Sequence, residues 1–161
     1  MKEHLELFCA SLNELSEIIE NRLDSKKLQA IGIVTSGDLA GIAAYYLTEE
    51  DFSETCDLYL RYSAVEWPNS EGDCFKKLSN ILEETHFALR RDIDYKKVIR
   101  DTFDLCIDAM KIVDLRNRFG EHLFITFASV DPNNEMLLEE ERFVEIMNPP
   151  LIYSNWKEEL S

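Results

Sequence analysis

The hydrophobic side chains of the first fifty residues change their spacing, and this change constrains the fold more than any other feature. In the first segment they recur at steps of three and four, at Leu5, Phe8, Leu12, Leu15 and Ile19. That spacing places them on one face of a helix. Residues 30–35 and 39–47 are instead β-branched, aromatic or small, and Gly37 between them can adopt the positive φ of a tight turn. We therefore expect a helix followed by an antiparallel hairpin.

The two spacings alternate along the rest of the chain. Thr48, followed by three acids, predicts a capping box and a short helix, and residues 59–65, ended by Pro68, predict a third strand. Two long amphipathic helices follow, the second beginning after Asp94 and ending at Phe119-Gly120. The remaining predicted elements are a strand at 123–128, a turn at 131–134, a helix at 135–147 and a last helix restarted by Asn148-Pro149.

This order of elements predicts an α+β fold, with a mostly antiparallel sheet of about four strands covered by amphipathic helices on one side. The Ala and Gly content of the hairpin also predicts that a helix lies close over one face of the sheet. The chain has 161 residues, with no repeat, low-complexity stretch or linker. We therefore expect residues 1–161 to form a single α+β domain.

The chain is strongly acidic, with 17 Lys and Arg against 32 Asp and Glu and a formal net charge of −15. Such a surface repels nucleic-acid phosphates and anionic membranes, so we expect neither as a partner. It attracts a basic protein, because complementary charge raises association rates and excludes wrong partners. The alternative is that the charge only keeps the protein soluble. Basic residues cluster once, and we expect them to offset nearby acids: Arg90, Arg91, Lys96, Lys97 and Arg100.

The cysteines and histidines form no recognisable disulfide or metal pattern. Cys9, Cys56, Cys74 and Cys106 include no C-x-x-C pair, and no histidine has a second His or Cys three or four residues away. We expect buried free thiols in a reducing cytoplasm, no metal and no cofactor. The N-terminus does not read as a signal peptide, and the longest apolar stretch is far shorter than the roughly 20 residues that span a bilayer. These features predict a cytoplasmic protein.

Two groups of residues are candidates for a site, although phosphate-loop and nucleophile motifs are absent. Glu66 beside Trp67 could act as a general acid, because an apolar ring raises the pKa of a carboxyl. The structural alternative is that Trp67 packs over the sheet edge while Glu66 pairs with a base or caps a helix. The other candidates are Asp131 and the run Glu139, Glu140 and Glu141, which is either a solvated helix face or a negative platform for a basic partner.

Four short segments carry a family resemblance. They are Leu60-Arg61-Tyr62-Ser63-Ala64-Val65-Glu66-Trp67, Phe119-Gly120, Ser129-Val130-Asp131, and Asn148-Pro149-Pro150-Leu151-Ile152-Tyr153 with Trp156 one turn later. In order and spacing they resemble the bacterial family catalogued as domain of unknown function 4303, over nearly the whole chain. Ala64 stands where relatives often carry Pro. The resemblance implies no reaction, and small acidic domains of this kind are loosely similar to the immunity proteins of bacterial toxin systems.

Three functional hypotheses follow, and the oligomeric state does not follow from the sequence. The first is a non-catalytic acidic binding protein, most plausibly an immunity (antitoxin-like) protein, that occludes a basic toxin domain through Glu66, Trp67, Asp131 and residues 139–141. The second is a small enzyme or ligand-binding domain with a site near Glu66 and Asp131. The third is a general bacterial interaction module. The first hypothesis requires no catalytic residue.

Overall fold

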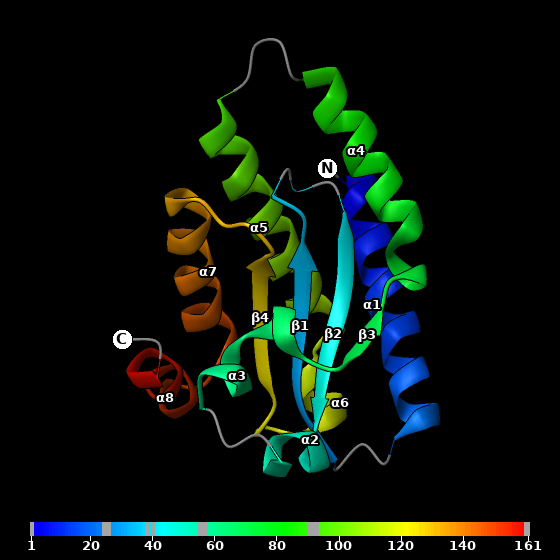
Figure 1. Cartoon of the computed structure of the whole chain (residues 1–161). Coiled ribbons are helices and arrows are strands. Elements are labelled where there is room, and N and C mark those ends of the chain that lie inside the picture. The colour runs from blue at the N-terminus through cyan, green and yellow to red at the C-terminus, as the bar shows by residue number, and fades with distance from the viewer. Residues whose placement is uncertain are drawn as a thin grey trace.

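A four-stranded sheet forms the centre of the molecule, and helices lie on both of its faces (Figure 1). The computed structural model describes residues 2–23, 27–37, 39, 41–54, 58–89 and 94–159. In spatial order the strands are β3 (Asn69–Glu71), β2 (Ile42–Thr48), β1 (Leu28–Thr35) and β4 (Phe124–Ser129). The α-helices are α1 (Lys2–Arg22), α2 (Glu49–Glu54), α3 (Leu58–Tyr62), α4 (Lys76–Leu89), α5 (Tyr95–Val113), α6 (Leu115–Phe119), α7 (Asn134–Met147) and α8 (Pro150–Glu159), and two 3-10 helices are η2 (Ala64–Glu66) and η3 (Asp73–Phe75).

The opening helix, the hairpin and the helix caps are confirmed. β1 and β2 pair antiparallel, from Leu28↔Thr48 to Thr35↔Ile42. At the start of α2 the Thr48 N–H donates to Asp51 Oδ2 at 2.9 Å, and the Asp51 N–H donates to Thr48 Oγ1 at 3.2 Å, as a capping box requires. Asp94 caps α5 by accepting a hydrogen bond from a backbone N–H. The predicted hairpin turn extends to Asp38, which lies outside the described residues.

The predicted third strand at residues 59–65 is wrong. This segment contains α3 and η2, and the strand β3 begins only after Pro68. A short apolar run fits a helix or a strand equally well by periodicity. Tertiary packing decides it here, because the rings of Tyr62 and Trp67 both meet Phe124 of β4 edge to face. The segment therefore covers the sheet instead of extending it.

The fourth strand is present, but it lies parallel to β1, from Ala30↔Phe124 to Thr35↔Ser129. The sheet is thus mixed, with two antiparallel pairings and one parallel pairing. A parallel pair needs a long crossover, and the chain between β1 and β4 includes the helices α4 to α6. As a result the carboxyl ends of β1 and β4 meet at the same end of the sheet.

The second long helix ends earlier than predicted. Asp114, with φ 50°, adopts the left-handed conformation after α5, and its side chain then caps α6 by accepting from the Asn117 N–H. The predicted stop at Phe119-Gly120 ends α6 instead, where Gly120 has φ 110°. One predicted helix is therefore two, joined by an aspartate that ends one and begins the next.

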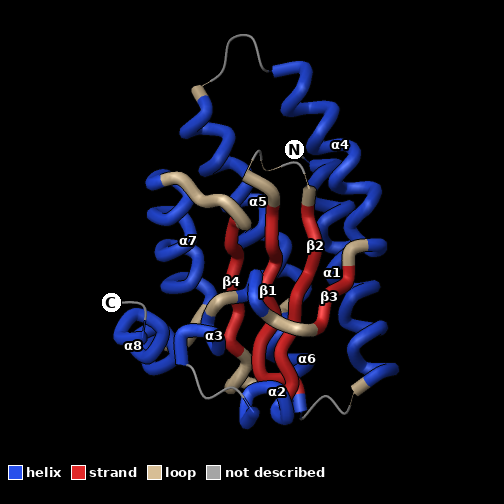
Figure 2. The backbone as a smooth tube through the Cα atoms, viewed as in Figure 1, coloured by secondary structure: helices blue, strands red, loops and turns tan. Residues whose placement is uncertain are grey.

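The back of the sheet carries the larger core, under α1, α4 and α5 (Figure 2). Alternate residues of β1 and β4 point to this face, as the pleat requires, including Ile31 and Phe127. The Phe103 ring of α5 lies 4.3 Å from the Phe127 ring, centroid to centroid. Phe143 of α7 joins the same aromatic cluster, so α7 closes the core beside β4.

The front of the sheet, which faces the viewer in Figure 1, is also covered in part, so the prediction of helices on one side only is wrong. η2 crosses β1 at Gly32, as the small residues of the hairpin predicted. A Cβ placed on Gly32 would lie 2.5 Å from the Ala64 Cβ and 3.0 Å from Trp67 Cζ3. The absence of a side chain at Gly32 therefore allows η2 to lie directly on the sheet.

Side chains occupy two places where a further strand would bind, namely the end of β2 that the short strand β3 does not cover and the outer edge of β4. On β2, Ser79 Oγ accepts from the Ile42 N–H at 3.0 Å. On β4, Asn148 Oδ1 accepts from the Ile125 N–H at 2.9 Å and Asn148 Nδ2 donates to the Ile125 carbonyl at 2.7 Å. Arg116 donates to the same Oδ1 at 2.8 Å. Each contact blocks strand addition at an edge that would otherwise template aggregation.

We expect Gly32→Ala to lower the free energy of unfolding by about 2–3 kcal/mol, because the new methyl group overlaps the Ala64 Cβ. Gly72→Ala is the matched control, since the nearest atom to its new Cβ is 4.0 Å away, and it should change stability by less than about 0.5 kcal/mol. Urea denaturation followed by circular dichroism measures both. Equal effects of the two substitutions would contradict this packing.

We expect Asn148→Ala to destabilise the protein by about 2–4 kcal/mol, because it leaves the buried Ile125 N–H and carbonyl without partners. Asn155→Ala, at an exposed position of α8, is the control and should be neutral within about 0.5 kcal/mol. Thermal unfolding of the three proteins compares them directly. A neutral Asn148→Ala would show that the amide does not close the β4 edge.

Candidate partner-binding surface

An open hollow of about 440 Å³ lies toward the carboxyl end of β1, beyond the part of the sheet that η2 covers. Val34, Ala43 and Tyr45 line it from the strands. Val130, which follows β4, lines it from the other side and is 66% exposed. A concave, mostly apolar site with a few polar groups is the usual form of a binding site. The hollow is therefore the first candidate for contact with a partner.

One carboxylate lines this hollow and a second belongs to the residue after Val130, and neither forms an ion pair among the described residues. Asp73 lines it at the start of η3. Asp131 lies beside the hairpin turn, where its carbonyl oxygen would be 3.3 Å from a Cβ on Gly37. Both residues are exposed. Lys76 also lines the hollow, so its lining carries one negative charge and one positive charge.

Trp67 has the structural role that the sequence left as an alternative, but it lies on the sheet face and not at its edge. It is 4% exposed, packs beside Gly32, and donates from Nε1 to the Leu60 carbonyl at 3.1 Å. Glu66 is exposed next to it, and its carboxylate has no hydrogen bond or ion pair within the described part of the chain. The tryptophan ring therefore does not bury the glutamate.

The structure does not bring Glu66 and Asp131 together. Trp67 and Thr126 both lie beside Gly32, whereas Asp131 follows Thr126 by five residues. The strand part of this interval, from Thr126 to Ser129, already extends for about 10 Å at roughly 3.3 Å per residue. The separation disfavours a single ligand site that uses both carboxylates. Asp131 instead follows Val130, which lines the hollow together with Asp73, a residue that the sequence gave no reason to select.

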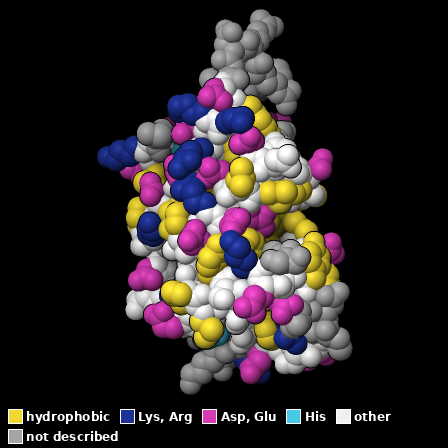
Figure 3. All heavy atoms as spheres, turned by 90° about the vertical axis from the view of Figure 1, so that its left-hand side faces the viewer, with side chains coloured by type: hydrophobic (Ala, Val, Ile, Leu, Met, Phe, Trp, Pro, Cys, Tyr) yellow, Lys and Arg dark blue, Asp and Glu magenta, His cyan; other side chains and the backbone are white. Residues whose placement is uncertain are grey.

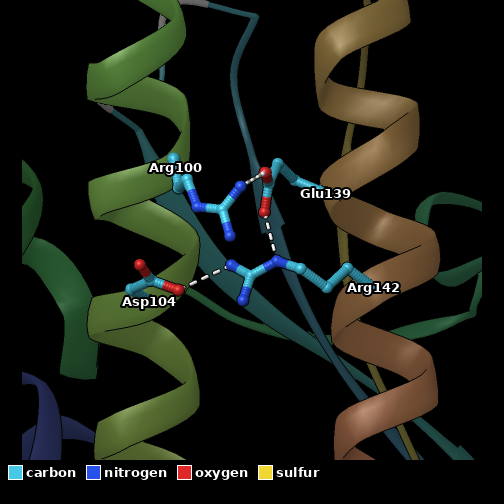
Figure 4. Close-up of polar contacts among 4 residues, drawn as sticks. All are labelled: Arg100, Asp104, Glu139 and Arg142. Atoms are coloured by element: carbon cyan, nitrogen blue, oxygen red, sulfur yellow. Dashed lines mark hydrogen bonds and ion pairs between the residues drawn. The ribbon is translucent and has the colours of Figure 1, made fainter.

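Glu139 is held in a network between α5 and α7 (Figure 4). Arg142 donates to Glu139 at 2.5 Å and to Asp104 at 2.6 Å, and Arg100 lies 3.5 Å from the other Glu139 oxygen. The Glu139 side chain is only 14% exposed. Its charge is therefore neutralised within the molecule and is not presented to a partner.

Glu141 is also engaged, with α8. It accepts from Lys157 Nζ at 2.6 Å and from the Tyr153 hydroxyl at 3.1 Å. The hydrogen bond from Lys157 is the main reason why the pKa of Glu141 lies below its usual value. This contact links the last two helices.

Glu140 differs from both neighbours, because it points to the inner side of α7. It is half-buried, and its carboxylate has no hydrogen bond or ion pair among the described residues. Burial alone raises the pKa of Glu140 to about 7. Three consecutive glutamates thus have three different environments, and the run 139–141 is not a uniform negative platform.

The face that carries α7 and α8 has mixed charge (Figure 3). Basic and acidic side chains alternate over it, with hydrophobic side chains among them. The predicted offsetting role of the basic cluster is confirmed where the structure describes it, because Lys96 pairs with Glu135, Lys97 with Asp101, and Arg100 with Glu139. Arg90 and Arg91 lie outside the described residues.

The cysteines are free thiols where the structure describes them. Cys74 and Cys106 are buried free thiols, as predicted, whereas Cys9 is a free thiol that is only partly buried, and Cys56 lies outside the described residues. Burial raises the pKa of Cys74 to about 11. No cluster of possible metal ligands occurs within residues 2–159 as far as they are described. Of the helices in that part of the chain, none has an apolar stretch that could cross a bilayer.

Comparison with known families gives one match: the model of the family described as "Domain of unknown function (DUF4303)" matches residues 9–146. Because this match spans most of the chain, the protein belongs to that family. Searches of curated proteins and of solved structures gave no match. The family resemblance of the sequence is therefore confirmed.

The segments that carried the resemblance have identifiable structural roles. Ala64 and Trp67 seat η2 on Gly32, and Asn148 closes the β4 edge. Proline at position 149 then precedes α8, as predicted. These motifs are signatures of the fold. Glu66 is the exception, because its side chain forms no hydrogen bond or ion pair within the described structure.

We expect Arg142→Met to lower stability by about 1–2 kcal/mol, because Arg142 is 26% exposed and bridges two carboxylates. Lys97→Met, at an ion pair whose lysine is 70% exposed, is the matched control and should leave the stability nearly unchanged. Chemical denaturation at low and high salt gives both values. Similar small losses for the two variants would show that the network contributes no more than a surface pair.

Proposed function

We propose that this member of the DUF4303 family is a non-catalytic binding protein that covers a basic surface of a partner protein. The main support is the hollow on the front of the sheet, whose mostly apolar lining includes Asp73 and Val130. Asp131 is next to Val130 in the chain, and neither aspartate forms an ion pair among the described residues. A site of this kind accepts an apolar anchor flanked by basic side chains. The formal charge of −15 would accelerate association with such a surface.

The partner that best fits these features is a toxin domain such as a nuclease, in which case the chain acts as an immunity protein in the bacterial cytoplasm. Such a protein needs a rigid scaffold, negative charge for steering and a few anchors in the partner's cleft. The core on the back of the sheet and the closed sheet edges supply a rigid scaffold. Asp73, Asp131 and Val130 are the residues we assign to the contact.

Co-expression tests this proposal. The proposal predicts that a neighbouring reading frame encodes a large secreted protein with a basic C-terminal domain, and the protein is produced together with that domain. We expect it to rescue growth and to form a complex on size-exclusion chromatography. Asp73→Asn with Asp131→Asn should weaken this complex by about 1–2 kcal/mol, or roughly 5- to 30-fold in Kd, because two interface charges are lost.

Glu83→Gln with Glu84→Gln is the matched control, since these exposed residues of α4 change the net charge by the same amount. The control should leave rescue and Kd unchanged within about twofold. Neither rescue nor a complex with the neighbouring domain would contradict the toxin partner. Equal weakening by both double variants would show that net charge, and not the hollow, determines binding.

A further inference from the structure

We propose that the hollow is one end of a longer docking surface, which continues onto the front side of α7 through Leu137 and Glu140 and takes a basic amphipathic helix of the partner. This inference rests on the proposed function, because it names the part of the partner that binds. It adds two contact residues on α7 to those assigned above, and it leaves the outer side of the same helix free.

The phase of α7 places Leu137 on the front of the molecule. Val144 belongs to the hydrophobic cluster on the front of the sheet, together with Phe124 of β4. Leu137 precedes Val144 by seven residues, or about two helical turns, so both side chains lie on one side of α7. Leu137 is in the first turn of α7, which follows the segment that contains Val130. It therefore lies at the same end of the sheet as the hollow.

Exposed apolar side chains continue from the hollow onto α7. Val130 is 66% exposed and Leu137 is 49% exposed, whereas Val144 further along the same side of α7 is fully buried. Figure 1 shows η2 crossing the front of the sheet, and no described helix lies in front of the sheet between η2 and the carboxyl ends of β1 and β4. Parallel strand pairs such as β1 and β4 are usually covered on both faces. We expect the partner to supply the cover at this end.

The bound element is a helix and not an added strand, because the sheet edge beside the hollow is closed. Ser79, which lines the hollow, accepts from the Ile42 N–H and donates to the Ile42 carbonyl at 3.4 Å. The partner therefore lies on the face of the sheet, as α1 and α5 do on the back. Apolar side chains at steps of three and four along its helix would contact the hollow, Val130 and Leu137.

Charge complementarity indicates that the partner helix carries basic side chains beside its apolar stripe. Asp73 lines the hollow, Asp131 follows Val130, and Glu140 lies one turn before Val144 on the front side of α7. None of these three carboxylates forms an ion pair among the described residues. Lys76 is a basic residue in the lining of the same hollow. The acids outnumber this base, so Lys or Arg is favoured at the flanks of the bound helix.

The two sides of α7 provide matched substitutions for a test. Leu137→Gln should weaken the complex with the basic partner domain by about tenfold in Kd, because it removes an apolar contact. Leu138→Gln is the control, since Leu138 is 63% exposed and lies on the outer side of α7 with Glu145. Glu140→Gln should also weaken binding by about tenfold, whereas Glu145→Gln should not. Titration calorimetry measures all four variants, after circular dichroism has confirmed that each one is folded.

Hydrogen exchange of the partner domain in the complex gives a second readout. Its newly protected segment should be a helix with an apolar stripe flanked by Lys or Arg. The inference is overturned if Leu137→Gln and Leu138→Gln bind equally well, or if the protected segment of the partner is a strand or a loop, and in both cases the proposed function still stands. Absence of any complex with the neighbouring domain overturns the proposed function and this inference with it.

Discussion

The close approach of Ala64 to Gly32 determines how the front of this sheet is used. A Cβ on Gly32 would meet Ala64 at 2.5 Å, so only glycine lets η2 lie flat against the sheet. Trp67 then covers the centre of the sheet, and Tyr62 packs on Phe124 of β4. Because η2 crosses β1 at Gly32, the sheet beyond Val34 stays open, and the hollow occupies that part. The same contact therefore supports the fold and leaves a surface for binding.

Local features of the sequence predicted most of the fold. The stripe of α1, the hairpin of β1 and β2, and the caps Thr48 and Asp94 depend on neighbouring residues, so their patterns are visible in the chain. The strand expected at 59–65 and the purely one-sided helix cover failed, because the packing of Tyr62 and Trp67 on β4 involves residues about sixty positions apart. The parallel direction of β4 depends on the crossover, which no local pattern encodes.

The candidate site shows the same division between local and long-range information. The sequence selected Asp131 and the glutamates 139–141 as candidate contact residues for a basic partner. The environments of Glu139 and Glu141, however, depend on residues of α5 and α8. Arg142 and Arg100 neutralise Glu139, Lys157 binds Glu141, and Glu140 turns inward without a counter-charge among the described residues. Asp73 was not selected, because only the fold brings it to the hollow that Val130, the neighbour of Asp131, also lines. A count of acids gives the net charge, and the ion pairs determine where that charge remains available.

The central claim of this account is that a partner binds at the hollow and not on the outer side of α7. Hydrogen exchange of the complex with the basic partner domain, compared with the free protein, tests it most directly. The account predicts new protection at residues 72–76 and 128–131, with the exposed side of α7 and α8 unchanged. Protection confined to α7 and α8, with no change around the hollow, would contradict it.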